Sequence, residues 1–97
     1  MTVGPARVVL PAALRPYAGG EAVVAVPLDD AVPLAEVLDT LGAVHPALIR
    51  RIRDERGILR RYVNVYVDGA DVRGEGGIET RVTPGSEVMV LPSVAGG

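Results

Sequence analysis

Cysteine, lysine, phenylalanine and tryptophan are all missing from this 97-residue sequence. The absence of cysteine excludes disulfide bonds, thiolate catalysis and cysteine metal sites, and it is typical of a cytoplasmic protein. Aromatic residues make up 3% of the chain and all of them are tyrosine, so we expect a core of valine, leucine, isoleucine and alanine. Because lysine is absent, no side-chain amine is available to attack an activated acyl group.

Long hydrophobic runs are also missing. No uncharged apolar stretch approaches the roughly 18 residues that a membrane span needs. The first residues are interrupted by Pro5, Pro11 and Pro16 and do not have the pattern of a signal peptide. The formal net charge is −2, which gives no general support to nucleic-acid binding. We therefore expect a cytoplasmic protein with no membrane partner and no nucleic-acid partner.

The overall composition is that of one packed domain. Hydrophobic residues make up 48% and charged residues 23%, and a chain of this length has no room for two independent cores. We expect a single domain over residues 1–97. Two β-rich runs, Arg7–Leu10 and Ala22–Val26, flank a turn-forming stretch at Leu14–Gly20 and predict a hairpin.

From Pro33 onward the apolar residues recur every three or four positions, which indicates one buried stripe on a helix. The stripe comprises Leu34, Val37, Leu38, Leu41, Val44, Leu48, Ile49 and Ile52. Proline suits the first position of a helix, where its missing N–H costs nothing. Pro46 interrupts regular bonding, so we predict a main helix to about His45 and a short second helix through Ile52.

The second half of the chain predicts strands again. Tyr62–Val67 alternates and precedes the turn-forming pair Asp68-Gly69, and Ala70–Arg73 is predicted as a short returning strand. Ile78–Val82 is predicted as a helical turn. A last strand is predicted over Glu87–Leu91, ended by Pro92. Hairpin strands and one amphipathic helix predict an α+β roll, in which the helix packs across a single sheet.

The side chains show no catalytic constellation and no metal site. His45 is the only histidine, and no second ligand lies at metal-binding spacing from it. Gly74–Gly77 lacks both common phosphate-loop patterns, and the acidic residues around it do not match a calcium loop. We therefore assign no catalytic residue, no metal ligand and no cofactor to this chain.

One segment, Arg50–Arg61, is rich in arginine. Asp54 and Glu55 dilute its charge, and no aromatic residues interleave with the arginines for base stacking. We interpret it first as a solvated face and second as a surface for partner docking. Binding of phosphate or RNA is the third interpretation.

The sequence ends in Gly96-Gly97, directly after a predicted strand. Glycine has the smallest cross-section and the freest backbone, so such an ending suits a narrow channel better than a packed fold. We expect residues 92–97 to form a flexible tail that reaches about 20 Å when extended. The α-carboxylate of Gly97 is ionised at neutral pH and could attack the α-phosphate of ATP, provided that a partner supplies the phosphate-binding site.

A family resemblance extends over essentially the whole domain. It is strongest in Arg61–Val67, in Asp71–Arg73 followed by Gly77, Ile78, Thr80 and Gly85, and in Leu91–Gly97. The sequence resembles the ubiquitin-like sulfur carriers of the MoaD/ThiS type, most closely those that serve cysteine biosynthesis. The resemblance implies a β-grasp fold with a mixed sheet of four to five strands. It also implies that the chain is a protein co-substrate and not an enzyme.

The resemblance further implies a reaction cycle and partners. An E1-like enzyme adenylates Gly97 with ATP, and a sulfur donor converts the adenylate to a thiocarboxylate. Val94, Ala95 and Gly96 thread into the partner sites. The sulfur acceptor is a PLP-dependent cysteine synthase or another sulfur-inserting synthase, including one for natural-product sulfuration.

Three alternatives remain open at this point. One is the small subunit of molybdopterin synthase, although Ser93 stands where such subunits often have a second proline. The second is a ubiquitin-like modifier whose Gly97 forms isopeptide bonds with target lysines. The third is ubiquitin-like docking without chemistry at the terminus, in which case deletion of Gly97 is harmless.

Overall fold

Five strands form the main sheet of this protein, which we describe from a computed structural model over residues 4–92. Their order across the sheet is β2-β1-β7-β4-β5. Neighbouring strands are antiparallel except for β1 and β7, which run parallel. The bounds are β1 Ala6–Val9, β2 Val23–Val26, β4 Val63–Val67, β5 Ala70–Asp71 and β7 Glu87–Pro92. The expected mixed sheet and the β1–β2 hairpin are confirmed.

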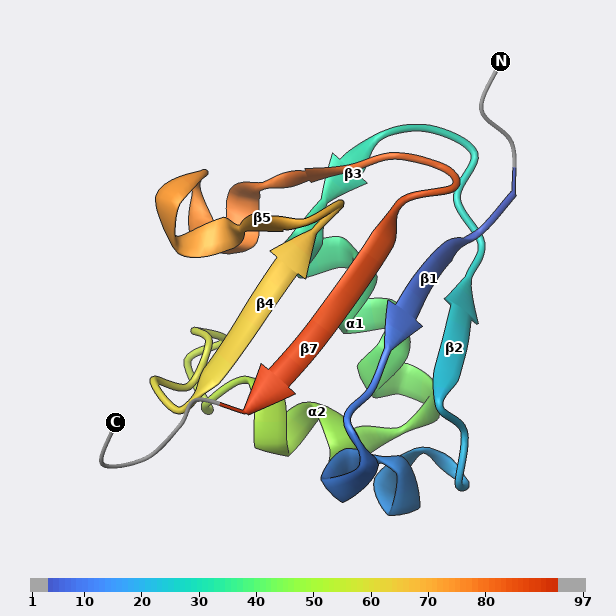
Figure 1. Cartoon of the computed structure of the whole chain (residues 1–97), viewed down its shortest axis with the longest axis vertical. Helices are drawn as coiled ribbons and strands as arrows, with labels where there is room; N and C mark the ends of the chain where they lie inside the picture. Colours follow the sequence, from blue (N-terminus) through green and yellow to red (C-terminus); the bar gives the residue numbers. More distant parts are fainter. Residues whose placement is uncertain (1–3, 93–97) are drawn as a thin grey trace.

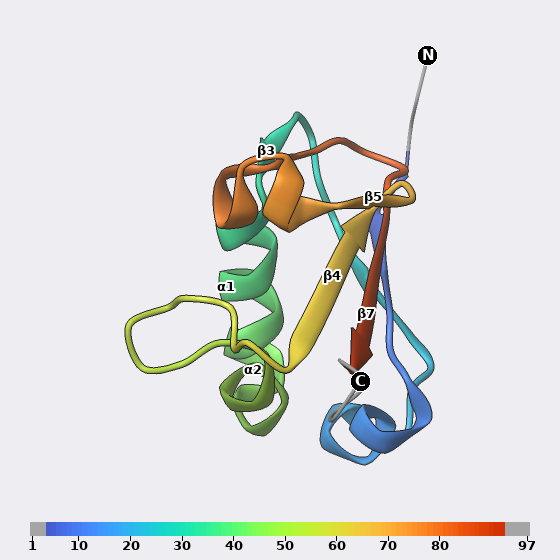
Figure 2. The same ribbon diagram turned by 60° about the vertical axis from the view of Figure 1, so that its left-hand side comes forward.

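Two helices cover one face of this sheet, as Figures 1 and 2 show. They are α1 (Leu34–Val44) and α2 (Pro46–Ile52), separated by His45. The predicted main helix and short second helix are therefore confirmed. Six residues of the predicted stripe are fully buried or nearly so: Leu34, Val37, Leu38, Leu41, Leu48 and Ile52.

The strands contribute the other half of the core because their side chains alternate between the two faces of the sheet. On β4, Val63, Val65 and Val67 are buried, while Tyr66 lies on the opposite face. On β7, Val88 and Val90 are both 0% exposed. The buried side chains of residues 4–92 are Val, Leu, Ile and Ala apart from Ser86, as the composition predicted.

Several small elements differ from the sequence prediction. The stretch predicted as a turn at Leu14–Gly20 forms a 3-10 helix, η1 (Ala12–Ala18), and Gly19 ends it with a φ of 66°. Two further 3-10 turns, η2 (Val72–Gly74) and η3 (Gly77–Glu79), follow β5. The predicted helical turn at Ile78–Val82 is therefore half helix and half strand.

A second, two-stranded sheet was not predicted. It pairs β3 (Val32–Pro33) with β6 (Arg81–Val82) in antiparallel register, directly before α1 begins. Pro33 thus lies in β3 at the N-cap of α1, so the helix begins at Leu34, one residue later than predicted. Within the described range, no helix is long and apolar enough to cross a membrane.

Candidate functional site

The centre of the sheet determines where the C-terminal segment leaves the fold. Strand β7 lies between β1 and β4, and its residues from Val88 to Pro92 pair with β4. The last of these pairs places Pro92 opposite Val63. Because Val88 and Val90 are fully buried, the strand that ends at Pro92 is anchored in the core.

The sequence-predicted site residues follow this strand. Val94, Ala95, Gly96 and Gly97 lie outside the described residues, so their role stays a prediction. Pro92, where the predicted tail begins, is the last residue of β7. Any group carried by the following residues starts from the end of a central strand, beside the beginning of β4.

An apolar groove of about 370 Å³ lies beside this strand end. Its walls come from η1 and the residues before it, from α2, and from the paired ends of β4 and β7. Leu91 is 39% exposed and Tyr62 is 54% exposed, so apolar surface is open to solvent here. The groove can hold an apolar side chain or an extended segment next to the end of β7. Its lining residues are Pro11, Ala13, Leu14, Tyr17, Arg51, Tyr62, Val63, Val90, Leu91 and Pro92.

Sequence reasoning did not connect Tyr17 and Arg51, two of the residues that line this groove. The Arg51 guanidinium lies 3.7 Å from the centroid of the Tyr17 ring, a cation–π contact. Arg51 also donates to the carbonyl of Ala47 at 3.2 Å, which fixes its direction along α2. Tyr17 and Arg51 are far apart in the sequence, and the contact exists because η1 packs against α2.

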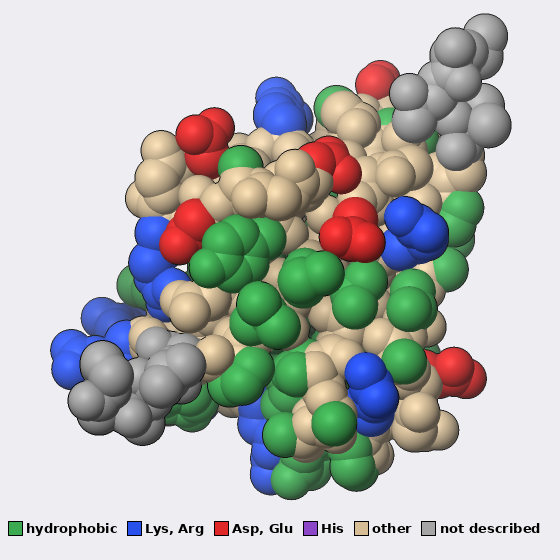
Figure 3. Space-filling view, viewed as in Figure 1, with side chains coloured by type: hydrophobic (Ala, Val, Ile, Leu, Met, Phe, Trp, Pro, Cys, Tyr) green, Lys and Arg blue, Asp and Glu red, His purple; other side chains and the backbone are tan. Residues whose placement is uncertain are grey.

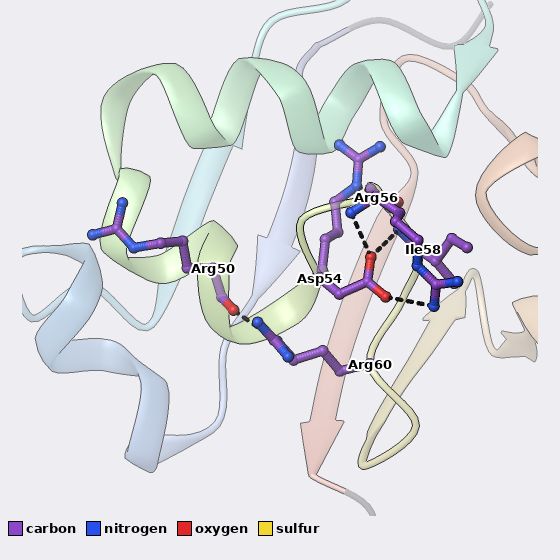
Figure 4. Close-up of polar contacts among 7 residues, drawn as sticks. Arg50, Asp54, Arg56, Ile58 and Arg60 are labelled. Carbon is purple, nitrogen blue, oxygen red and sulfur yellow. Dashed lines mark hydrogen bonds and ion pairs between the residues drawn. The ribbon is translucent and has the colours of Figure 1, made fainter.

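A second hollow, about 600 Å³, lies between α1, α2 and the loop that leads to β4. The predicted loop Asp54–Arg61 is present, and Asp54 organises it (Figure 4). Asp54 Oδ1 accepts hydrogen bonds from the backbone N–H groups of Arg56 and Ile58, at 2.8 and 3.1 Å. Arg56 donates from its guanidinium to Asp54 Oδ2 at 3.1 Å. The hydrogen bond from Ile58, followed by the contacts with Arg56, holds the pKa of Asp54 below its ordinary value.

The remaining side chains offer no catalytic constellation within residues 4–92. No group of three or more His, Asp or Glu side chains in that range could hold a metal ion. His45 joins the two helices through its backbone, since its N–H donates to Leu41 and its carbonyl accepts from Leu48. Gly74 ends η2 and Gly77 begins η3, and the three-residue η3 is too short to be the helix of a phosphate loop.

Comparisons with known proteins place this geometry in a family. Residues 8–97 match the model of the ThiS family. The sulfur carrier protein CysO of Mycobacterium tuberculosis is 39% identical over 90 residues, which cover 91% of this chain and 94% of that protein.

Two solved structures support the same assignment. The structure titled Amycolatopsis orientalis BexX/CysO complex contains a chain that superposes with a TM-score of 0.83 at 36% identity, covering 95% of this chain and 99% of that one. SAMP1 from Haloferax volcanii superposes with a TM-score of 0.78 at 30% identity and covers 97% of this chain and all of its own. The mixed sheet crossed by a helix is the ubiquitin-like β-grasp fold of these neighbours, and this chain belongs to the ThiS family.

Proposed function

We propose that this chain is a sulfur carrier that serves cysteine biosynthesis or natural-product sulfuration and carries its sulfur on the C-terminal carbonyl of Gly97. The observation that carries the proposal is the 39% identity to the sulfur carrier protein CysO over 91% of the chain. The family match and the superposition on the CysO chain support it. The anchored end of β7 supports it too, because the group would be presented from a fixed point on the fold.

The chemistry requires two substitution steps, both in partner enzymes. In the first, an oxygen of the Gly97 carboxylate attacks the α-phosphorus of ATP, so that an acyl–phosphate bond forms and pyrophosphate leaves. In the second, a hydrosulfide-equivalent donor attacks the acyl carbon, so that a carbon–sulfur bond forms and AMP leaves. The product is a thiocarboxylate, whose sulfur is the nucleophile for the accepting enzyme.

We assign the ATP-binding site to a partner enzyme and only the reactive carboxylate to this chain, because of the side chains that this chain has. Adenylation needs a water-excluding site with groups that stabilise the phosphates. The described residues of this chain form no group of three or more His, Asp or Glu side chains that could hold a metal ion for such a site. We therefore propose that the chain is a co-substrate. An E1-like enzyme supplies the ATP site, and Val94, Ala95 and Gly96 enter its channel because they are small.

The partner that consumes the sulfur is also proposed from the similarity to CysO. A solved neighbour is titled as a BexX/CysO complex, so a related carrier forms a complex with a second protein. We propose a PLP-dependent cysteine synthase or another sulfur-inserting synthase as the acceptor for this chain. A molybdopterin-synthase subunit and a protein modifier are the alternatives, and the similarity to CysO over nearly the full chain favours the carrier.

Reconstitution tests this function. The wild-type chain is incubated with ATP, a sulfide donor and the E1-like enzyme of the source organism, and the thiocarboxylate is captured with an alkylating reagent specific for that group. We expect ATP-dependent formation of the alkylated product. A chain extended by one alanine beyond Gly97 is the matched control and should give none. Isopeptide-linked products on target lysines, without a thiocarboxylate, would favour the modifier instead.

A further inference from the structure

Arginine side chains gather on one side of the sheet, next to the end at which β7 finishes (Figure 3). Six of the ten arginines lie within residues 50–61. Two of these are neutralised, since Arg53 pairs with Asp39 at 2.7 Å and Arg56 pairs with Asp54 at 3.1 Å. The other arginines near this end form no ion pair within residues 4–92. Leaving aside Arg51, which lies on Tyr17, and Arg15, which belongs to η1, we name the remaining four the arginine rim: Arg50, Arg60, Arg61 and Arg73.

Two members of the rim are held in place by neutral oxygen atoms. Arg60 donates from Nε to the carbonyl of Arg50 at 2.8 Å, a contact drawn in Figure 4. Arg73 donates to Asn64 Oδ1 at 2.8 Å and to the carbonyl of Arg60 at 2.9 Å. A carbonyl or amide acceptor orients a guanidinium without cancelling its charge. These arginines therefore keep their positive charge and lose little rotamer freedom when they bind an anion.

The rim lies beside the residues that pair with the end of β7. Asn64, which binds Arg73, pairs with Leu91, and Arg61 precedes Val63, the partner of Pro92, by two positions. In Figure 3, viewed as Figure 1, blue side chains gather along the left and lower-left margin, next to this end of the sheet. A protein that approaches the end of β7 thus comes within reach of the rim.

The charge distribution favours an acidic partner at this place. Six arginines against Asp54 and Glu55 give residues 50–61 a formal charge of +4. Because the whole chain carries −2, the other residues together carry −6. An acidic surface would be repelled by most of the molecule and attracted to the rim, which orients the encounter.

We propose that the arginine rim docks an acidic surface, rich in Asp and Glu, around the entrance through which the E1-like enzyme takes up the C-terminal segment. The proposal rests on the proposed function, because it assigns the rim to the partner that activates Gly97. Four charge-bearing side chains would then control how fast the two proteins meet, while the chemistry at Gly97 would not depend on them.

Nucleic acid is a less suitable occupant of the same surface. Single-stranded nucleic acid is bound by positive charge together with aromatic rings that stack on the bases. At this end of the fold Tyr62 is exposed, but Arg51 lies over the Tyr17 ring, and Asp54 and Glu55 stand among the arginines. The arrangement fits a patterned protein surface better than a uniform phosphate backbone.

Steady-state adenylation by the E1-like enzyme of the source organism tests the proposal. The variant Arg61→Glu reverses an exposed charge whose side chain makes no hydrogen bond or ion pair with the described residues. Arg81→Glu is the matched control, since Arg81 is also exposed and lies at β6, away from the rim. Circular dichroism and thermal melting confirm that both variants fold. The double variant Arg50→Glu/Arg61→Glu extends the series.

We expect Arg61→Glu to lower kcat/KM about fivefold and the double variant to lower it by about 20-fold or more at low salt, as for steered association. We expect kcat to be unchanged, Arg81→Glu to stay within about twofold of wild type, and the differences to shrink at high salt. Equal kcat/KM values for wild type and Arg61→Glu at low salt would overturn the proposal, as would an equal loss in Arg81→Glu.

Two further outcomes separate the alternatives. If the wild-type chain is not adenylated at all, the proposed function fails and not merely the docking surface. If a 12-nucleotide single-stranded RNA binds the wild-type chain tightly at physiological salt and Arg61→Glu abolishes that binding while adenylation is unchanged, the rim is a nucleic-acid surface and the docking proposal is wrong.

Discussion

Ser86 donates a 2.9 Å hydrogen bond from its hydroxyl to Asp68 Oδ2, and this contact joins the beginning of β7 to the turn after β4. The second oxygen, Asp68 Oδ1, accepts from the backbone N–H of Glu87 at 2.9 Å. Ser86 is 4% exposed, and its oxygen also accepts from the N–H of Thr83. Asp68 thus determines where the strand that leads to the C-terminus begins its pairing.

Removal of this hydroxyl should destabilise the fold. We expect Ser86→Ala to lower the free energy of unfolding by about 1–2 kcal/mol, because the Thr83 N–H loses its acceptor and Asp68 Oδ2 loses its donor. Urea denaturation measures the change. The control is Thr40→Ala, which removes an exposed hydroxyl bonded within α1 and should cost less than about 0.5 kcal/mol. Equal stabilities of Ser86→Ala and wild type would contradict the role given to this contact.

The two faces of β7 should respond differently to truncation. Val90 is 0% exposed and its neighbour Leu91 is 39% exposed on the opposite face. We expect Val90→Ala to lower the free energy of unfolding by about 2 kcal/mol, since the cavity it leaves lies in the core. Leu91→Ala should cost clearly less, although it removes the larger side chain. Thermal or urea unfolding of both variants measures the two changes. A greater loss of unfolding free energy in Leu91→Ala than in Val90→Ala would show that the assigned faces are wrong.

The loop before β4 should weaken at low pH. Hydrogen bonds from Ile58 and then Arg56 depress the pKa of Asp54, so its ionised form is favoured by folding. The stabilisation is fully present above the ordinary aspartate pKa and is lost as the pH falls through the lower, folded-state value.

Carbon-detected NMR titration of the Asp54 carboxyl measures this pKa, and amide hydrogen exchange at Ile58 reports the loop. We expect an Asp54 pKa below the ordinary aspartate value and faster exchange at Ile58 in Asp54→Asn at neutral pH. An Asp54 pKa equal to or above the ordinary aspartate value would contradict the contacts assigned to the loop.

Periodicity predicted the elements that carry a long, regular pattern. The stripe from Leu34 to Ile52 determined α1 and α2, and the alternation around Val65 determined β4. Short elements were missed, because β3 has two residues and one of them is Pro33, which no strand pattern favours. Likewise, η1 contains Pro16 and was predicted as a turn, since its packing against α2 is not visible in the local sequence.

For the candidate site, too, one part could be predicted from the sequence and the other could not. Gly97 was identified from the motif in which the sequence ends, and it lies outside the described residues, so its role rests on the family and on experiment. The groove and the arginine rim depend on tertiary structure. Arg51 meets Tyr17, and Arg73 meets Asn64, only after α2 and β4 have packed beside η1 and η2. No local pattern in one sequence encodes such contacts.

Locating the sulfur atom on the chain tests the central claim most directly. The protein is isolated from its source organism with its native C-terminus, treated with the thiocarboxylate-specific alkylating reagent, and fragmented by mass spectrometry. Fragmentation is needed because oxidation of Met89 adds nearly the same mass as an oxygen-to-sulfur exchange. We expect the label on the C-terminal fragment that contains Gly97 and no label in a chain from which Gly97 has been deleted. Labelling of the deletion variant, or an unlabelled Gly97 in the protein isolated from growing cells, would contradict the account.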